Sequence, residues 1–460
     1  MKTKIKQLFR QKDVYRDQEV TIYAWVRTNR AQAQFGFLNV NDGSFFDNLQ
    51  VVYDNKLNNF EEISKFRVGV SVKIKGKVVL TPELKQPLEL HAIEVVMLGD
   101  CPENYPIQPK RHTREFLREV AHLRPRTNLF SAVFRIRSVA AMAIHTYFQE
   151  RGYVYVHTPL ITCADCEGSD QMFKITTLDL NNLPKVDGQV DYSKDLFGKQ
   201  SWITGSGQLQ GETFAMAFGD IYTFGPTFRT ENSNTKIHAN EFWMIEPEMA
   251  FCDLNELMDI EEEMLKFVIQ YVVDNCPEEI NFCDQFVEKG LKNKIDNLLS
   301  SKFIRISHHD VVDILKKSNV KWEFEPSYED DIAKEHEKYI TEYFNGPVFI
   351  KDWPKDIKAY YMKLNPDGKT VAAVDLVVPQ AGELMGGSQR EEDLAVLLAR
   401  MKELDIDASG IDWYLDTRRY GGCVHSGFGM GFERLIMYLT GIDNIRDSIP
   451  FPRTPKNCEF

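Results

Sequence analysis

The sequence predicts an α+β protein with two domains, a small β-barrel followed by a larger domain in which helices flank a mainly antiparallel sheet. The chain has 460 residues, more than one ordinary domain requires. Its first 100 residues read as short strands separated by turn residues. After a break marked by prolines, long helical patterns alternate with further strands. The hydrophobic content of 43% is that of a globular protein.

Five strand-like runs define the first domain, at 20–26, 35–40, 49–53, 70–80 and 88–97, with a short helical stretch at 58–66. Five strands with a helix after the third are typical of the OB fold, a Greek-key barrel that commonly binds single-stranded nucleic acid. Phe35 and Phe37 on one strand are candidate stacking platforms, and Gln50 on the next could read a base edge. The alternative is that at least one of these aromatic residues belongs to the barrel core.

The predicted boundaries follow from composition. Residues 1–100 form the barrel, 101–126 a proline-marked linker or hinge, and 127–460 the second domain. The second domain opens with a long helix at 128–150, closed by Gly152. Its other expected elements are strands at 153–162, 358–364 and 371–379, helices at 259–274, 286–299 and 392–405, and a polar loop or insertion at 178–198.

Charge and cysteine content limit the functional classes. A net charge of −13 argues against a general affinity for nucleic acid but leaves room for local basic faces. Two such clusters are Lys2, Lys4, Lys6, Arg10 and Lys12, and Lys110, Arg111, Arg114, Arg118, Arg124 and Arg126. The eight scattered cysteines predict reduced thiols and a cytoplasmic protein, and Cys163 with Cys166 read as loop thiols because no second pair follows. No apolar run is long enough for a membrane span, and no signal peptide is evident.

The segment Phe228-Arg229-Thr230-Glu231 carries the strongest chemical signal. Alternation along a strand would place Arg229 and Glu231 on one face, before a polar loop and a second strand at 241–251. A planar guanidinium at the mouth of such a hairpin suits a site where a phosphate meets a carboxylate. The alternative is a surface ion pair.

A glycine-rich strand near the end of the chain is the second signal. Gly427, Gly429 and Gly431 alternate along one strand face and would leave a floor without side chains for a base or a phosphate. The strand runs into a helix that ends at Gly441, so Arg434 lies in its first turn, where anions are favoured. The alternative is tight sheet packing beside a surface arginine.

Two weaker patterns add candidate ligands. Glu383 in a glycine-rich loop, with Asp375 on the preceding strand, could hold Mg²⁺ bridging nucleotide phosphates. Gln208 and Glu212 stand one helical turn apart and can converge on a small ligand. The alternatives are a solvated glutamate and an ordinary serine-capped helix start.

The order of these pieces resembles the three signature motifs of class II aminoacyl-tRNA synthetases. A helix and a strand carrying Pro159 come first, the Arg229 hairpin next, and the glycine-rich strand with Arg434 last. The OB-like domain points to the aspartate, asparagine and lysine subgroup. Segments 224–251 and 427–455 resemble the asparagine-specific enzymes of bacterial type, and the resemblance covers essentially the whole chain.

The resemblance implies an ATP site with Mg²⁺. Arg229 would bind the α-phosphate and the amino-acid carboxylate, and Arg434 would hold the γ-phosphate, with Glu231 as a third catalytic residue. The further residues implied for ATP are His238, Phe242, Glu383, Gly429 and Gly431, and Asp375 would join Glu383 on Mg²⁺.

The resemblance also implies how L-asparagine is chosen. Glu167 would accept the α-ammonium group, Gln208 would orient the substrate, Arg390 would donate to the side-chain carbonyl, and Glu212 would accept from the side-chain amide. Relatives specific for aspartate carry a lysine where this chain has Gly211. Mispairing a buried polar group costs about 1–3 kcal/mol, so an aspartate facing Glu212 would be disfavoured.

The implied reaction forms asparaginyl-AMP and transfers asparagine to tRNA(Asn). In the barrel, Phe37 would stack on an anticodon base, Gln50 would read its edge, and Arg27 would lie near the phosphates. The helix before Pro159 implies a homodimer. The rival hypotheses are an aspartate-specific or non-discriminating enzyme, an AMP-forming asparagine synthetase, and a non-catalytic RNA-binding paralogue.

Overall fold

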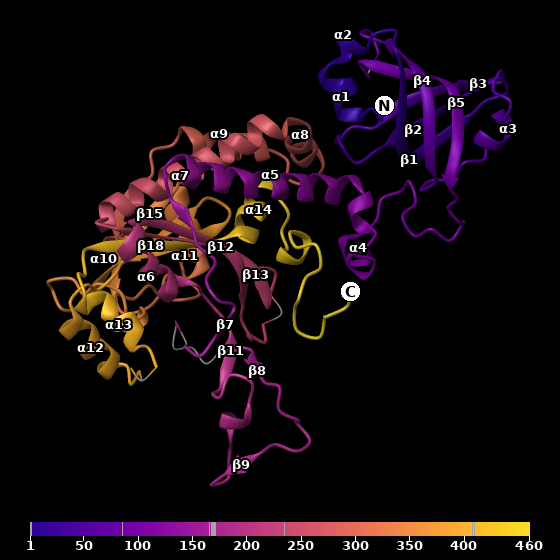
Figure 1. Cartoon of the computed structure of the whole chain (residues 1–460). Helices are drawn as coiled ribbons and strands as arrows, with labels where there is room; N and C mark the ends of the chain where they lie inside the picture. The colour runs from indigo at the N-terminus through magenta and orange to yellow at the C-terminus, as the bar shows by residue number, and fades with distance from the viewer. Residues whose placement is uncertain are drawn as a thin grey trace. The chain divides into compact units, whose positions relative to one another are not determined.

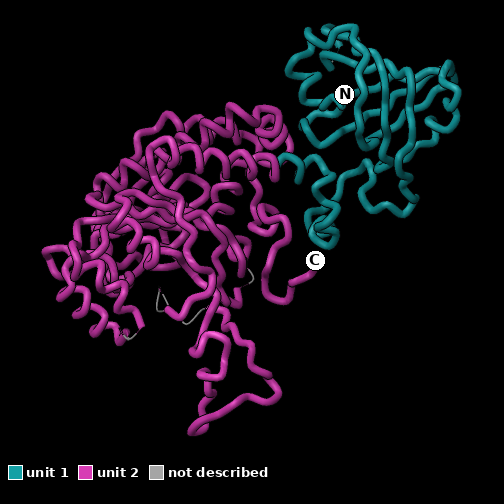
Figure 2. Tube along the Cα trace, viewed as in Figure 1, with its two compact units in different colours: residues 1–132 teal, residues 133–460 magenta. Residues whose placement is uncertain are grey.

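The structure is a computed structural model that describes residues 2–84, 86–164, 166, 172–233, 235–406, 408 and 410–460. The chain divides into two compact units, Met1–Ala132 and Val133–Phe460 (Figure 2). The division falls inside the long helix α5 (Asn128–Glu150), a few residues after the predicted boundary between linker and second domain.

The first unit is a closed five-stranded barrel with the strand order β1-β2-β3-β5-β4 (Figure 1). Strands β3 and β5 run parallel, and the other neighbours are antiparallel. The OB-fold prediction is confirmed. The elements of this unit are α1 (Ile5–Arg10), α2 (Lys12–Tyr15), β1 (Glu19–Ala31), β2 (Phe35–Asn41), β3 (Leu49–Asp54), α3 (Phe60–Ile63), β4 (Ser71–Leu80), β5 (Leu88–Gly99), α4 (Arg114–Glu119) and the 3₁₀ turn Arg124–Arg126.

One asparagine fixes α3 to the barrel wall. Asn29 of β1 donates through Nδ2 to the backbone oxygen of Ile63 at 2.8 Å, and its Oδ1 accepts from the Tyr53 hydroxyl at 2.9 Å. Tyr53 is almost fully buried, so this pair satisfies polar groups that water cannot reach.

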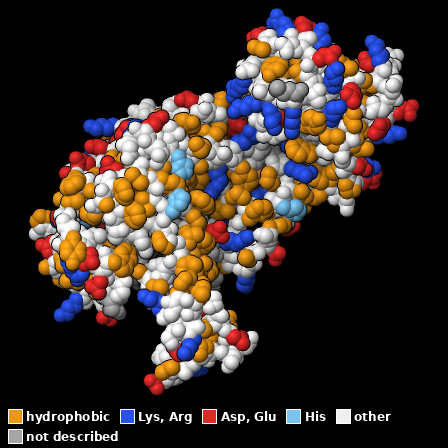
Figure 3. Space-filling model, viewed as in Figure 1, with side chains coloured by type: hydrophobic (Ala, Val, Ile, Leu, Met, Phe, Trp, Pro, Cys, Tyr) orange, Lys and Arg blue, Asp and Glu red, His pale blue; other side chains and the backbone are white. Residues whose placement is uncertain are grey.

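The two predicted basic clusters differ in how exposed their side chains are. All five members of the N-terminal cluster are exposed, and lysine and arginine side chains are visible over the barrel unit in Figure 3. In the second cluster Arg124 is completely buried, and its guanidinium lies 4.3 Å from the centre of the Phe130 ring. Arg124 is therefore a core residue rather than part of a solvated face.

The second unit is built on an eight-stranded sheet with the order β14-β15-β16-β17-β18-β13-β12-β6. The pairs β14–β15 and β12–β6 at its two ends are parallel, and the five pairings between them are antiparallel. The strands are β6 (Val154–Tyr155), β12 (Asp220–Phe228), β13 (Glu241–Ala250), β14 (Ile304–Ser307), β15 (Val348–Pro354), β16 (Thr370–Val378), β17 (Gly382–Gln389) and β18 (His425–Gly431).

Helices cover this sheet, and α7 packs on β16, β17 and β18. The helices of the unit, besides α5, are α6 (Gln208–Phe218), α7 (Leu254–Asn275), α8 (Pro277–Phe286), α9 (Leu291–Ser300), α10 (His308–Lys317), α11 (Lys334–Tyr343), α12 (Leu394–Glu403), α13 (Asp412–Arg419) and α14 (Phe432–Thr440). Short 3₁₀ turns lie at Tyr192–Lys194, Lys355–Ile357 and Ile445–Asp447. In the described part of the chain, none of the helices is long and apolar enough to cross a membrane.

Three sequence predictions need correction. The expected strand at 358–364 makes only isolated bridges, at Met362 and Leu364, and Tyr360 is buried in a side-chain cluster instead. The helix expected at 286–299 begins only at Leu291, as α9, because α8 ends at Phe286 and Gly290 adopts φ +91° between the two helices. The strand expected at 153–162 is two short pieces, β6 and β7 (Ile161–Thr162).

The pattern-poor segment at 178–198 extends away from the main sheet (Figure 1). Its base is a small sheet of β7, β8 (Lys174–Ile175) and β11 (Ser201–Ile203). Its tip is a two-stranded hairpin of β9 (Lys185–Val186) and β10 (Gln189–Val190). Asp187 and Gly188 both have positive φ, as a tight two-residue hairpin turn requires.

Candidate active site

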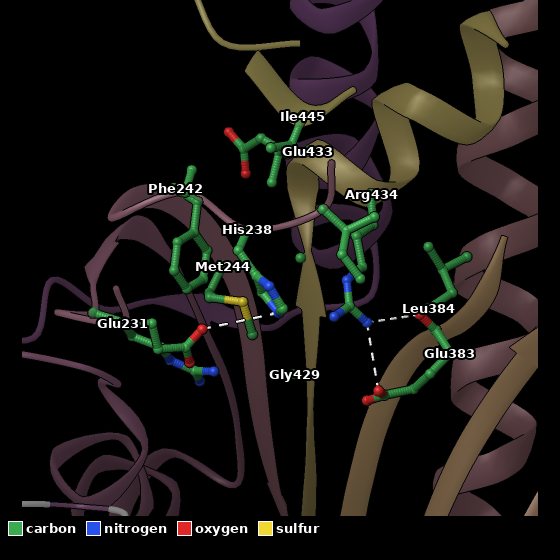
Figure 4. Close-up of a pocket in the computed structure, with 14 residues that line it drawn as sticks. Glu231, His238, Phe242, Met244, Glu383, Leu384, Gly429, Glu433, Arg434 and Ile445 are labelled. Atoms are coloured by element: carbon green, nitrogen blue, oxygen red, sulfur yellow. Dashed lines mark hydrogen bonds and ion pairs between the residues drawn. The ribbon is translucent and has the colours of Figure 1, made fainter. Parts of the chain in front are cut away.

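All eight residues expected for ATP line one cavity of about 160 Å³ in the second unit (Figure 4). The cavity lies over β13 and β18, between the loop that follows β12 and the start of α14. Its lining residues are Arg229, Glu231, Ile237, His238, Ala239, Phe242, Met244, Glu383, Leu384, Gly429, Gly431, Glu433, Arg434 and Ile445.

Arg229 and Glu231 reach this cavity from a loop, not from a strand. β12 ends at Phe228, so the expected strand alternation does not apply. Instead, Asn240 donates through Nδ2 to the backbone oxygens of Arg229 at 2.8 Å and Glu231 at 3.1 Å, which fixes the loop. Across the cavity the Glu231 carboxylate lies 3.9 Å from His238 Nε2 (Figure 4).

Arg434 faces Glu383 at the other end of the cavity. It lies in the first turn of α14, as predicted, and its Nη1 donates to the Glu383 backbone oxygen at 2.8 Å. The Glu383 carboxylate is 3.4 Å from the same nitrogen. The next residue back, Glu433, is structural: it is buried and accepts from the Trp243 backbone nitrogen at 2.9 Å, and it pairs with Arg137 at 2.8 Å.

A second cavity, of about 220 Å³, adjoins the first. Arg229, Met244, Glu383 and Gly429 line both. The other residues of the second cavity are Ser206, Gln208, Glu246, Glu248, Tyr361, Met362, Asp375, Gly386, Gly387, Arg390 and Phe428. Arg229 therefore lies between two adjoining cavities, one lined by the residues expected for ATP and the other lined by Gln208 and Arg390.

Glu246 is a fixed carboxylate in the second cavity. One oxygen accepts from the Ser206 hydroxyl, and the other accepts from the Gly207 backbone nitrogen at 3.2 Å and the Thr223 hydroxyl at 3.3 Å. Sequence reasoning missed this residue. It could have been found from the side-chain period of two along β13, which places Phe242, Met244, Glu246 and Glu248 on one face of the strand.

Arg390 is clamped by Glu248. Its Nη2 and Nε donate to the two Glu248 oxygens at 2.5 and 3.1 Å, and its Nη1 donates to Ser388 Oγ at 2.8 Å. A Cβ on Gly427 would lie 2.3 Å from the Glu248 carboxyl group, so only glycine leaves room for this pair. Burial raises the pKa of Glu248; Arg390 opposes that rise and Glu212 adds to it.

The predicted glycine floor is thus partly covered. Glu248 lies over Gly427, and the terminal methyl of Met244 is 2.9 Å from where a Cβ on Gly429 would be. Gly429 and Gly431 still line the first cavity. Gly427 and Gly429 therefore make room for neighbouring side chains, and Gly429 and Gly431 leave room for a ligand.

Glu212 is completely buried behind the second cavity. It touches two lining residues: its Oε1 accepts from Gln208 Nε2 at 3.0 Å and lies 4.0 Å from Arg390 Nε. Tyr414, Arg418 and His425 also donate to its carboxylate, at 3.1, 2.8 and 3.0 Å. With these donors in place, a substrate amide would have to take the position of one of them to reach Glu212.

Asp375 and Glu383 present oxygens to one point above the sheet. A Cβ on Gly386 would lie 3.2 Å from Asp375 Oδ1 and 3.3 Å from Glu383 Oε1. Carboxylate oxygens are the ligands that Mg²⁺ prefers, and glycine leaves this point open, so the pair fits a hard divalent cation. Burial raises the pKa of Asp375 to about 6, although the Lys358 ammonium, 2.7 Å from its other oxygen, opposes the rise.

The remaining predictions concern Glu167 and the pair Cys163 and Cys166. Glu167 lies outside the described residues. Cys163 is exposed and Cys166 buried, both as free thiols, and neither belongs to a group of metal-binding side chains within the described ranges.

In the barrel unit three of the predicted nucleic-acid residues, Phe35, Phe37 and Gln50, share one outer face. Cross-strand pairing aligns Arg30, Phe37, Val52 and His91 in one row, and Thr28, Asn39, Gln50 and Glu89 in the next. Phe35 is exposed and Phe37 half-buried, so neither is a core residue. Gln50 Nε2 donates to Glu89 Oε1 at 2.6 Å, and Arg27 donates to the backbone oxygen of Arg126.

Comparison with known proteins agrees with this geometry. The family described as tRNA synthetases class II (D, K and N) matches residues 113–455, and the OB-fold nucleic acid binding domain matches residues 20–98. Asparagine–tRNA ligases of Acholeplasma laidlawii and Clostridium tetani are 60% and 55% identical, over 99% and 100% of both chains.

A solved structure supports the same relationship. The asparaginyl-tRNA synthetase of Pyrococcus horikoshii, complexed with asparaginyl-adenylate, is 30% identical with a TM-score of 0.85 and covers 100% of both chains. The chain therefore belongs to the class II tRNA synthetases of the D, K and N group, and within them to the asparagine–tRNA ligase family.

Proposed function

We propose that the chain activates L-asparagine with ATP to form asparaginyl-AMP and then transfers asparagine to the 3′ end of tRNA(Asn), releasing pyrophosphate and AMP. The position of Arg229 carries the proposal, because it lines both cavities. A guanidinium placed there can hold the α-phosphate of ATP with one edge and the asparagine carboxylate with another.

Positioning and charge carry the chemistry. The asparagine carboxylate attacks the α-phosphorus in line and pyrophosphate leaves, so the first step requires no protein nucleophile. Arg229 at the α-phosphate and Arg434 at the γ-phosphate offset negative charge in the transition state. The terminal ribose hydroxyl of the tRNA then attacks the adenylate carbonyl, and AMP leaves.

The purine end of ATP fits the aromatic side of the first cavity. Phe242 stacks beneath the adenine, with Gly429 and Gly431 alongside, and Glu231 and His238 close the far wall. Arg229 also lies over the Phe242 ring, 5.5 Å from its centre, which holds both groups in place.

Asp375 and Glu383 would hold Mg²⁺, which neutralises phosphate charge when it is bound. The support for this assignment is the point above Gly386 on which one oxygen of each carboxylate converges.

The amino-acid cavity separates the two ends of asparagine. Arg229 takes the α-carboxylate, so the α-ammonium falls near Glu246 and Gln208, and we retain Glu167 as a second partner. The side chain then extends toward Arg390, which has Glu212 and Glu248 beside it. Two arginines, Arg390 and Arg418, balance these two glutamates, an arrangement that suits a neutral carboxamide better than a carboxylate.

The barrel face supplies the tRNA contacts. Phe37 stacks on an anticodon base, Gln50 reads a base edge, and Arg27 lies near the phosphates. We also propose a homodimer formed through α5 and its surroundings, supported by exposed apolar side chains at Met142, Phe218 and Phe251. All eight cysteines are free thiols, in keeping with the proposed cytoplasmic location.

Amino-acid-dependent ATP–pyrophosphate exchange tests the first step. We expect kcat/KM for asparagine to exceed that for aspartate by at least about 100-fold, because aspartate brings a carboxylate against Glu212 and Glu248. Equal or faster exchange with aspartate would contradict the assignment.

Phe37→Ala tests the barrel. Loss of one stacking platform costs about 1–3 kcal/mol, so kcat/KM for tRNA charging should fall about 5- to 150-fold while exchange is unchanged. Val14→Ala, at an exposed apolar position on α2, is the control and should leave both rates unchanged. Charging by Phe37→Ala at the wild-type rate would exclude Phe37 from tRNA binding.

Asp375→Asn tests the metal site. Removing one anionic ligand should raise the Mg²⁺ concentration that gives half-maximal exchange by at least about tenfold. Asp356→Asn, an exposed aspartate nearby in sequence, should not change it. An unchanged Mg²⁺ requirement in Asp375→Asn would place the metal elsewhere.

A further inference from the structure

Arg418 of α13 is a buried charge next to the amino-acid cavity but outside its lining. Its Nη2 donates to Glu212 at 2.8 Å and to the Tyr414 hydroxyl at 2.9 Å. Its Nε donates to the Glu391 backbone oxygen at 2.9 Å, and its Nη1 to the Thr417 hydroxyl at 2.7 Å. All three guanidinium nitrogens are therefore hydrogen-bonded to protein groups. Arg418 contacts Glu212, and Glu212 contacts Gln208, which lines the cavity.

The two oxygens of Glu212 face different neighbours. Oε1 accepts from Gln208, which lines the cavity, and from the Tyr414 hydroxyl at 3.1 Å, and lies 4.0 Å from Arg390 Nε. Oε2 accepts from Arg418 Nη2 and from His425 Nε2. His425 is held in turn by its Nδ1, 2.8 Å from the Cys423 backbone oxygen. Oε1 is thus the oxygen in contact with residues that line the cavity, while the cationic Arg418 holds Oε2.

A carboxylate without solvent stays ionised only where cations compensate it. Burial alone would raise the pKa of Glu212. The charge of Arg418 is the largest single opposing contribution, and together with the hydrogen bond and charge of His425 and the charge of Arg390 it holds that pKa below its ordinary value. Arg390 is already committed to Glu248 through two hydrogen bonds, so Arg418 is the arginine in direct contact with Glu212.

We propose that Arg418 is a positioning residue that sets the choice between asparagine and aspartate by keeping Glu212 ionised and fixed in orientation. This inference rests on the proposed activation of asparagine. An ionised Glu212 can accept from a carboxamide and repels a carboxylate. Without Arg418 the buried carboxyl group takes up a proton, and a neutral acid can donate to the side chain of aspartate.

The test is Arg418→Met in the full-length chain, with kcat and KM for pyrophosphate exchange measured separately for asparagine and aspartate. We expect the asparagine-to-aspartate ratio of kcat/KM to fall at least about tenfold, with a lower KM for aspartate. Arg419→Met is the matched control: Arg419 is the next residue of α13, is partly exposed, and pairs with Asp416 at 2.8 Å. Its ratio should equal that of the wild type.

A folded, asparagine-active Arg418→Met protein with the wild-type ratio would overturn the proposal, and so would an equal fall in Arg419→Met. If Arg418→Met does not fold, comparing Glu212→Gln with the double variant Glu212→Gln/Arg418→Met replaces it, because the buried carboxylate is then already neutral. We expect Glu212→Gln to lower the ratio and the added Arg418→Met to change it by less than about twofold. A further tenfold fall in the double variant would show that Arg418 acts by another route.

The wild-type protein separates this inference from the proposed function. Wild-type protein that gives no asparagine-dependent exchange would contradict the proposed function itself. Wild-type exchange with asparagine, together with unchanged ratios in the variants, would contradict only the role of Arg418.

Discussion

The pairing of β13 with β12 on one side and β18 on the other determines both cavities. β13 places Phe242, Met244, Glu246 and Glu248 on one face, and the β13–β18 register sets Glu248 opposite Gly427. Because the side-chain period of a strand is two, a slip of one residue would turn all four side chains away from the ligand face. The aromatic end for the base and the acidic end for the amino acid therefore depend on one register.

The amino-acid cavity is bordered by buried ion pairs, and removing one partner of such a pair would destabilise the fold. Glu212 and Glu248 are compensated by Arg418 and Arg390, and each pair is completed by hydrogen bonds from neighbouring groups. Removing one member of a buried ion pair typically costs about 3–5 kcal/mol, whereas removing both can be nearly neutral. Such a network stabilises little on its own, but it fixes the position and sign of the charges that meet the substrate.

Much of the site could be predicted from sequence because its residues lie in local patterns. Arg434 follows from a glycine strand running into an amphipathic helix, and Gln208 with Glu212 from one helical turn. Glu246 and Glu248 could also have been predicted, because the side-chain period of two along the strand puts them on the same face as Phe242. The contact of Arg418 with Glu212 could not be predicted in this way, because α13 lies about 200 residues from Glu212 in sequence and only tertiary folding brings them together. The strand expected at 358–364 failed because apolar side chains such as Tyr360 enter a core cluster without forming a ladder.

Arg229 joins the nucleotide and amino-acid cavities, because it lines both of them. Isothermal titration calorimetry of ATP and of asparagine, each added separately to Arg229→Gln and Arg434→Gln, tests it most directly. A lost charge-assisted hydrogen bond should weaken binding about tenfold or more. We expect Arg229→Gln to weaken the binding of both ligands. Arg434 lines the nucleotide cavity but not the amino-acid cavity, so Arg434→Gln should weaken the binding of ATP alone. If Arg229→Gln weakened the binding of only one ligand, Arg229 would not serve both cavities.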